Sequence, residues 1–405
     1  MNFKLHQIQR KDKSAKAGDP TATRSLNLTI FESAITAGLI SMSIMTPFYY
    51  SIGLDNAEIA CAQALFTAVV LMLNLPMGWL ADRLSRKWAN VIGDFGQTIG
   101  FLIYAMADSF TDVVLCECLL GVSISISQGV DFALLRHFSK RISPHEDFFR
   151  KQSSKLAFWQ NFCALGLVML GGPLGVIDFR LAIALSGVPS FLGGVASIFV
   201  VDDSTKLKQI AENPLKDMCG IVKLAFTKPS LRNRLFVYAI GREMTHSVIW
   251  VLTPMLLSVG VPLIIVSLVW VIDCLMRIIG TQLALRYAGG MSASRIFGTP
   301  LLLMTVSMSI LTIRLNIWTI GFYLLMGITC GWTGATLMPL VQEETPPDKQ
   351  TTVASLAKVM GQMLYIPVAL LTGWAADFHL RYATLVTLVV FVPLGLVVLG
   401  RIKRE

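Results

Sequence analysis

The sequence is poor in charged residues, which make up only 15% of its 405 positions, whereas 54% are hydrophobic. Soluble proteins carry about 25% charged residues, so this composition excludes an ordinary soluble domain. A helix needs about 20 apolar residues to cross a bilayer, and nearly charge-free stretches of that length recur along almost the whole chain. The sequence therefore predicts an all-α, multi-pass membrane protein.

The chain also lacks the patterns that indicate a metal site, a disulfide framework or ATP hydrolysis. Its seven cysteines are odd in number and scattered, without C-x-x-C spacing or histidine partners, which is typical of small buried residues. No GxxxxGK[ST] loop and no H-E-x-x-H motif occurs. We expect no metal, no cofactor and no enzymatic activity. The vague match of Gly121-Val122-Ser123-Ile124 to the serine motif of intramembrane proteases is better explained by helix packing.

The net charge of +9 does not indicate nucleic-acid binding, because the basic residues lie between apolar segments and form no basic domain. If the amino terminus is cytoplasmic, most of the basic residues lie on the cytoplasmic side of the membrane. The opposite side then receives only Arg180, Arg314 and Arg381. By the positive-inside rule both termini are expected in the cytoplasm.

Twelve membrane spans are expected. We place them at 26–52, 58–81, 88–107, 113–138, 156–176, 181–201, 235–257, 263–285, 296–313, 317–341, 352–375 and 382–400. The longest polar interruption after the amino terminus lies near the midpoint and has apolar residues at helical spacing, which predicts an amphipathic helix on the inner membrane face. The predicted organisation is a basic segment (1–26), a six-helix bundle (27–201), this linker (202–234) and a second six-helix bundle (235–405).

The second and third spans are joined by a turn with one acid and three bases. It reads Gly78-Trp79-Leu80-Ala81-Asp82-Arg83-Leu84-Ser85-Arg86-Lys87. This resembles the signature loop of the major facilitator superfamily, usually G-x-L-a-D-r-x-G-r-k, with Ser85 where glycine is usual. The resemblance implies two halves of six helices and secondary active transport of a small molecule across the lipid bilayer.

Two further segments narrow the resemblance. The run from Cys116 to Leu135 looks like that of a bacterial subgroup of presumed drug and metabolite exporters, although Arg136 and His137 depart from it. Gly172-Pro173, in a glycine-rich fifth span, partly resembles the helix 5 motif of the superfamily's antiporters. The resemblance implies proton-coupled efflux across the inner membrane of a bacterium, and one twelve-span chain is sufficient as a monomer.

The resemblance also assigns a role to the signature loop. Asp82, Arg86 and Asp131 would form a charge cluster that latches the two halves together in the outward-facing state. Asp82 would face the amino-terminal end of helix 11, where partial positive charge favours an anion. The alternative is an ordinary loop obeying the positive-inside rule.

Ionisable residues inside spans are costly and by default mark a transport pathway. The candidates are Glu32, Glu117, Arg242, Glu243, His246, Asp273, Arg277 and Lys358. Glu32 and Asp273 are the leading proton carriers, with His246 third; Asp94 has a structural interpretation. Each also has a simpler interpretation: an interface position for Glu32 or Glu117, a closed pair of Asp273 with Arg277 one turn away, or a hydrogen-bonded interior residue for His246.

Two directions of transport remain open from the residues. The partial helix 5 motif favours an exporter driven by proton antiport. The cationic set Arg242, Arg277 and Lys358 favours a symporter that imports a nutrient or an organic anion.

Overall fold

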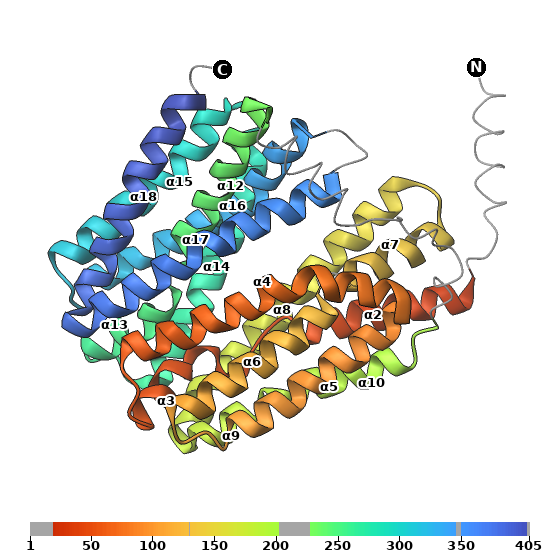
Figure 1. Ribbon diagram of the computed structural model, residues 1–405, viewed down its shortest axis with the longest axis horizontal. Helices are drawn as coiled ribbons and strands as arrows, with labels where there is room; N and C mark the ends of the chain where they lie inside the picture. Colours follow the sequence, from red (N-terminus) through yellow and green to blue (C-terminus); the bar gives the residue numbers. More distant parts are fainter. Residues whose placement is uncertain (1–18, 129, 202–226, 346–349, 403–405) are drawn as a thin grey trace, which may run out of the picture.

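The computed structural model describes residues 19–128, 130–201, 227–345 and 350–402, with the side chains of 74–84, 146, 147, 150 and 350–352 left aside. The side chains of the signature-loop residues Gly78, Asp82 and Arg83 and most of the predicted linker therefore lie outside what is described. In the described parts every regular element is helical, which confirms the all-α prediction (Figure 1).

The first half forms six passes from paired and single helices. These are α2 (Pro20–Ile35), η2 (Ile40–Ser43) and α3 (Met45–Ser51); α4 (Asn56–Leu84); α5 (Arg86–Tyr104); α6 (Phe110–Ser127) and α7 (Val130–Ile142); α8 (Glu146–Ile177); and α9 (Phe179–Leu185) and α10 (Gly187–Ile198). Helix α8 begins ten residues before the span expected at 156–176, because its first turns are polar and hydropathy detects only the apolar part.

The second half repeats this plan. Its elements are α12 (Pro229–His246), η4 (Ile249–Val251) and α13 (Leu252–Ser258); α14 (Leu263–Tyr287) with η5 (Ala288–Gly290); α15 (Ala293–Ile313); η6 (Thr319–Tyr323) and α16 (Leu324–Glu343); α17 (Gln350–Phe378); and α18 (Leu380–Ile402). Ten of the twelve passes are long and apolar enough to cross a membrane by length and composition alone. The other two, α5 and α12 to α13, carry more polar residues, which is where buried chemistry is expected.

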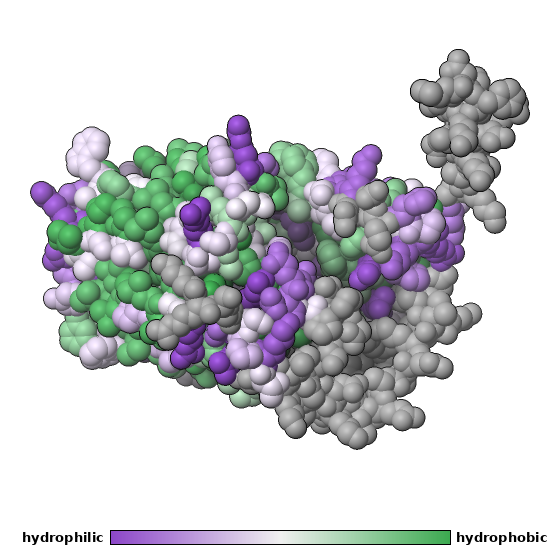
Figure 2. Space-filling model, turned by 90° about the horizontal axis from the view of Figure 1, so that it is seen from above, coloured by the Kyte–Doolittle hydropathy of each residue, from purple (hydrophilic) through white to green (hydrophobic). Residues whose placement is uncertain are grey.

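The two halves form two bundles (Figure 1) that touch mainly through α4 with α17 and α8 with α14. The start of α2 and the end of α18 lie toward one end of the molecule, which we call the terminal end (Figure 1). The opposite end, where Asp377 contacts Asn56, is called the closed end. In the view onto the terminal end, hydrophilic side chains gather along the middle of the surface (Figure 2).

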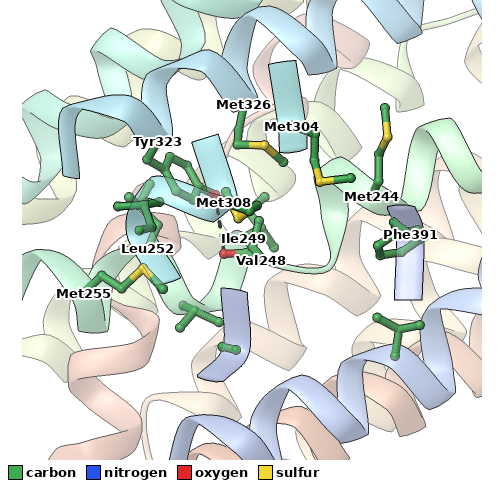
Figure 3. Close-up of a cluster of buried hydrophobic side chains, with 14 of the residues drawn as sticks. Met244, Val248, Ile249, Leu252, Met255, Met304, Met308, Tyr323, Met326 and Phe391 are labelled. Atoms are coloured by element: carbon green, nitrogen blue, oxygen red, sulfur yellow. Dashed lines mark hydrogen bonds between the residues drawn. The ribbon is translucent and has the colours of Figure 1, made fainter. Parts of the chain in front are cut away.

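The core of the second half is rich in methionine (Figure 3). Met244, Met304, Met308 and Met326 are all buried in one cluster with Phe391. Methionine fills irregular gaps because its side chain is unbranched and polarizable. The cluster surrounds the break between α12 and α13, where the Tyr323 hydroxyl donates to the carbonyl oxygen of Val248 at 3.4 Å.

Candidate functional site

Two Thr-Pro pairs hold the halves together near the closed end. Proline lacks an N–H, so Pro47 and Pro254 each leave a carbonyl four residues earlier without its helical partner. The hydroxyl of Thr253 donates to the freed oxygen of Ser43 at 3.3 Å, and that of Thr46 donates to the freed oxygen of Trp250 at 3.4 Å. Each half thus satisfies a carbonyl that a proline has freed in the other. Both threonines are buried.

Helices α4 and α17 make a second contact at the closed end. Asp377 at the end of α17 accepts hydrogen bonds from the backbone N–H groups of Asn56 and Ala57 at 2.7 and 3.0 Å. It therefore caps the first turn of α4 from the other half. Gly373 permits this approach, since a Cβ there would lie 2.3 Å from that of Ala60. From this contact α4 and α17 diverge toward the terminal end (Figure 1).

A small cavity of about 20 Å³ lies just inside these contacts. It is lined from both halves, by Ile59 and Ala60 of α4 and by Trp250 and Tyr365 of the second half, among others. Residues one and two turns nearer the terminal end on the same helix faces are therefore aimed at the space between the halves.

The α12 face aimed at that space carries charge. Trp250 is followed toward the terminal end by His246 and Arg242, and the His246 ring packs on Tyr365 with centroids 4.8 Å apart. Glu243 lies behind them, with Arg242 Nε 3.4 Å from its Oε1 and His246 Nδ1 3.6 Å from its Oε2. Arg242 and His246 are about 40% exposed, whereas Glu243 is 1% exposed.

Helix α17 completes this wall. Lys358 lies two turns from Tyr365 on the same face and is exposed. Gly361 lies between them, and a Cβ at that position would approach Glu243 Oε1 to 2.8 Å. The glycine therefore lets α17 close over the buried carboxylate. We call Arg242, His246 and Lys358 the cationic wall.

Asp273 and Arg277 form the pair that their spacing predicts. Arg277 Nε and Nη2 both lie on Asp273 Oδ2, at 2.8 and 2.7 Å. Asp273 is buried and its backbone packs on Gly327 of α16, where a Cβ would meet Asp273 Oδ1 at 2.8 Å. The structure thus favours the closed-pair interpretation of Asp273.

The first half contains a cluster of three acids, Glu32, Asp94 and Asp131, from α2, α5 and α7. The Glu32 carboxyl group lies close enough to those of both aspartates to interact with them electrostatically, and Gly193 packs against both Glu32 and Asp94. Glu32 and Asp94 are each 1% exposed, and Asp131 is partly exposed. Asn90 donates to Asp131 Oδ1 at 2.6 Å. We call these three residues the carboxyl cluster; from the sequence alone, Asp94 has only a structural interpretation.

Two oxygens of the carboxyl cluster, Glu32 Oε2 and Asp94 Oδ2, receive no hydrogen bond from a donor among the described residues. Three acids thus lie together inside the first half with few hydrogen-bond donors around them among the described residues.

Comparison with known proteins identifies the family. The model of the Major Facilitator Superfamily matches residues 26–369. The chain belongs to this superfamily. No curated protein matches the sequence.

Solved structures of several transporters share the fold at low identity. The nucleoside transporter NupG superimposes with a TM-score of 0.74 at 12% identity, covering 96% of this chain and 100% of its own. A bacterial homologue of the human lysosomal transporter Spinster, in an inward-facing and occupied conformation, gives 0.76 at 11%, with 96% and 98% covered. A D-xylose–proton symporter gives 0.70 at 14%, with 93% and 95% covered. At such identities the likeness shows the fold alone.

The superfamily's signature loop is described here only at its end. Arg86 and Lys87 begin α5, and Ser85 before them has φ = 137°. That is a conformation that glycine adopts easily and serine does not. This backbone conformation explains why glycine is usual at this position in the superfamily. The latch that would join Asp82 to Asp131 stays a prediction, since the Asp82 side chain lies outside the described residues.

The helix 5 motif lies at the contact between the halves. The N–H of Gly172 donates to Ser267 Oγ of α14 at 2.5 Å, and Ser267 Oγ is also 2.7 Å from Ser43 Oγ. A Cβ at Gly171 would stand 2.3 Å from the Ile40 carbonyl oxygen. Gly171 and Gly172, which precede Pro173, therefore let α8 approach η2 and α14.

Glu117 lies neither at an interface nor in the space between the halves. It is buried in the first-half core, where its Oε1 accepts from Gln63 at 2.6 Å, Tyr104 at 2.8 Å and Tyr49 at 3.0 Å. These donors come from three different helices, so sequence spacing could not reveal them. The repeated Thr-Pro dipeptide, by contrast, was a signal in the sequence for the contact at the closed end.

Proposed function

We propose that this superfamily member couples the transport of a small organic solute to protons by alternating access, and that it works as an exporter. The observation that carries proton coupling is the carboxyl cluster. Three carboxyl groups in contact repel one another when charged, so the cluster retains a proton that can leave when Asp131, its partly exposed member, gains access to water.

Alternating access is supported by how the halves meet. Their hydrogen bonds at the closed end join short side chains and backbone groups, namely the Thr-Pro pairs, Ser267 and Asp377. Such contacts can break and reform as units when two bundles rock against each other. The Spinster homologue of the same fold has an inward-facing conformation, and we propose that the terminal end of this protein faces the cytoplasm of a bacterium.

Export is favoured by the helix 5 contact, because Gly172 lets α8 pack against α14 of the other half at Ser267. A symporter is the second candidate, and one structural neighbour is named a D-xylose–proton symporter. The two directions differ in the sign of proton movement when solute is added.

The experiment uses the purified chain in liposomes that contain a pH-sensitive dye and carry an imposed pH gradient. We expect added solute to cause proton counterflow in the wild type and none in Glu32→Gln or Asp131→Asn. Asp108→Asn, a substitution of an exposed acid, serves as the matched control and should behave as wild type. Proton movement in the same direction as the solute would identify a symporter, and solute-driven flux that persists in both variants would exclude coupling through the cluster.

A further inference from the structure

We infer that the cationic wall binds the negative group of an anionic organic solute. This inference rests on the proposed transport function and names the substrate class of the same space between the halves. It concerns Arg242, His246 and Lys358, which the carboxyl cluster does not use.

The ion pair of Arg242 with Glu243 is asymmetric, because the base is 40% exposed and the acid 1% exposed. The acid is thus hidden in the bundle, whereas the guanidinium is accessible. A solute that enters meets donors and positive charge, although the pair is neutral as a whole.

Lys358 lacks an acidic partner within the described parts of the chain. The charged group there that acts on it electrostatically is another base, Arg242. Two cations side by side inside a membrane protein are unfavourable unless an anion bridges them. The carboxyl groups of Glu32, Asp94 and Glu117 do not serve this purpose, because all three are buried in the other half.

Aromatic rings lie at the end of the cationic wall that is nearer the closed end. His246 packs on Tyr365, and Trp250 and Tyr365 line the small cavity beyond. Rings at this level offer flat apolar contact to the body of a solute, while guanidinium and ammonium groups nearer the terminal end bind a carboxylate or phosphate. The wall therefore suits a small organic acid that carries its charge toward the terminal end.

The test is a thermal-shift screen of the purified full chain with three matched sets of small compounds: organic acids, including carboxylates and sugar phosphates; their uncharged amides or parent alcohols; and organic ammonium ions. We expect stabilisation from members of the acid set only, with affinity about tenfold weaker in Lys358→Gln and in Arg242→Gln. Lys358→Arg should retain binding, and Arg314→Gln, which removes an exposed charge elsewhere, should match wild type.

The inference is overturned if stabilising compounds are uncharged or cationic, if no acid stabilises, or if binding of an acid survives both substitutions. Binding is measured here without any gradient. A result against proton coupling in liposomes would therefore leave anion binding intact, and loss of anion binding would leave the coupling experiment valid with another solute.

Discussion

Single buried carboxylates in this protein are held by specific donors, and Glu117 is the clearest case. Three donors meet at its Oε1 in the core of the first half. Glu117→Ala would leave Gln63, Tyr49 and Tyr104 with fewer acceptors, at a cost of roughly 1–3 kcal/mol. Thermal unfolding in detergent should show this loss, with a smaller one for Glu117→Gln, which keeps an acceptor oxygen. An unchanged midpoint in Glu117→Ala would show that the three hydrogen bonds to Glu117 add no stability.

Ser85 stores backbone strain at the start of α5. A non-glycine residue at positive φ costs about 1–3 kcal/mol, and Ser85 has φ = 137°. We expect Ser85→Gly to raise the unfolding midpoint, measured by thermal unfolding in detergent. The control is Ser294→Gly, in the first turn of α15, which should lower the midpoint slightly. A lower midpoint in Ser85→Gly would contradict the account.

Glu344, just beyond α16, supplies a pH dependence at the terminal end. Hydrogen bonds from Lys228 and Ser230, at 2.7 and 2.9 Å, lower the pKa of this carboxyl group from its ordinary value, with help from Arg234. Its stabilisation is therefore complete above the ordinary pKa and is lost as the pH falls through the lowered value. Unfolding midpoints measured across that acidic range should fall less steeply in Glu344→Gln than in wild type; parallel curves would contradict this.

Charges inside helices were visible in the sequence, but their partners were not. The pair of Asp273 and Arg277 follows from one-turn spacing within a single helix. The partners of Glu32 and Glu117 come from other helices. A single sequence does not show which residues of different helices lie side by side, so these partners could not be predicted. Glu32 is deeply buried, which argues against its interface interpretation, while its role as a proton carrier stays a prediction.

The two halves contact each other through the first and seventh passes, each of which is interrupted near a Thr-Pro pair. Thr46→Val and Thr253→Val remove the hydroxyl groups that satisfy the carbonyls of Trp250 and Ser43. Thr253→Val also removes the oxygen that accepts from Trp270 Nε1 at 3.0 Å, so Thr46→Val is the cleaner of the two variants. We expect each variant to open the closed end more often, because an unsatisfied buried carbonyl costs about 1–3 kcal/mol. The readout is the labelling rate of a cysteine placed at Ala60, which lines the cavity at this contact, in a background without native cysteines.

Thr305→Val is the matched control, since its hydroxyl bonds only within its own helix, to Leu301 at 2.7 Å. Its labelling rate should equal that of the parent. Faster labelling in the control as well would show that the whole protein has become looser. Unchanged rates in Thr46→Val and Thr253→Val would show that the Thr-Pro hydrogen bonds do not keep the closed end shut.

Helix number was predictable because hydropathy reports bilayer crossing, but helix shape was not. The first pass was expected as one helix over 26–52 and is broken into α2, η2 and α3. The break depends on tertiary contacts: the N–H of Ser41 donates to Ser186 Oγ at 2.9 Å, and Gly38 allows Ala164 to approach. The seventh pass is broken in the corresponding place, before Pro254, which a comparison of the two halves' Thr-Pro dipeptides could have indicated.

At the scale of the whole molecule, two bundles touch at the closed end and diverge toward the terminal end. Protons held by the carboxyl cluster would govern the exchange between this arrangement and its opposite. The superfamily fold is established by the match over residues 26–369, and the sequence predicted it from one ten-residue loop together with twelve apolar segments. The solute could not be predicted in the same way, since it depends on which side chains face the space between the halves.

One measurement tests proton-controlled alternating access most directly. Spin-label distances would be recorded across the closed end, between Asp55→Cys and Phe378→Cys, and across the terminal end, between Trp88→Cys and Arg401→Cys, at low and high pH in lipid nanodiscs. All four positions are exposed. The account predicts that a pH change lengthens one distance while shortening the other, and that Glu32→Gln with Asp131→Asn abolishes the response. Distances that stay fixed, move in the same direction, or respond equally in the double variant would contradict it.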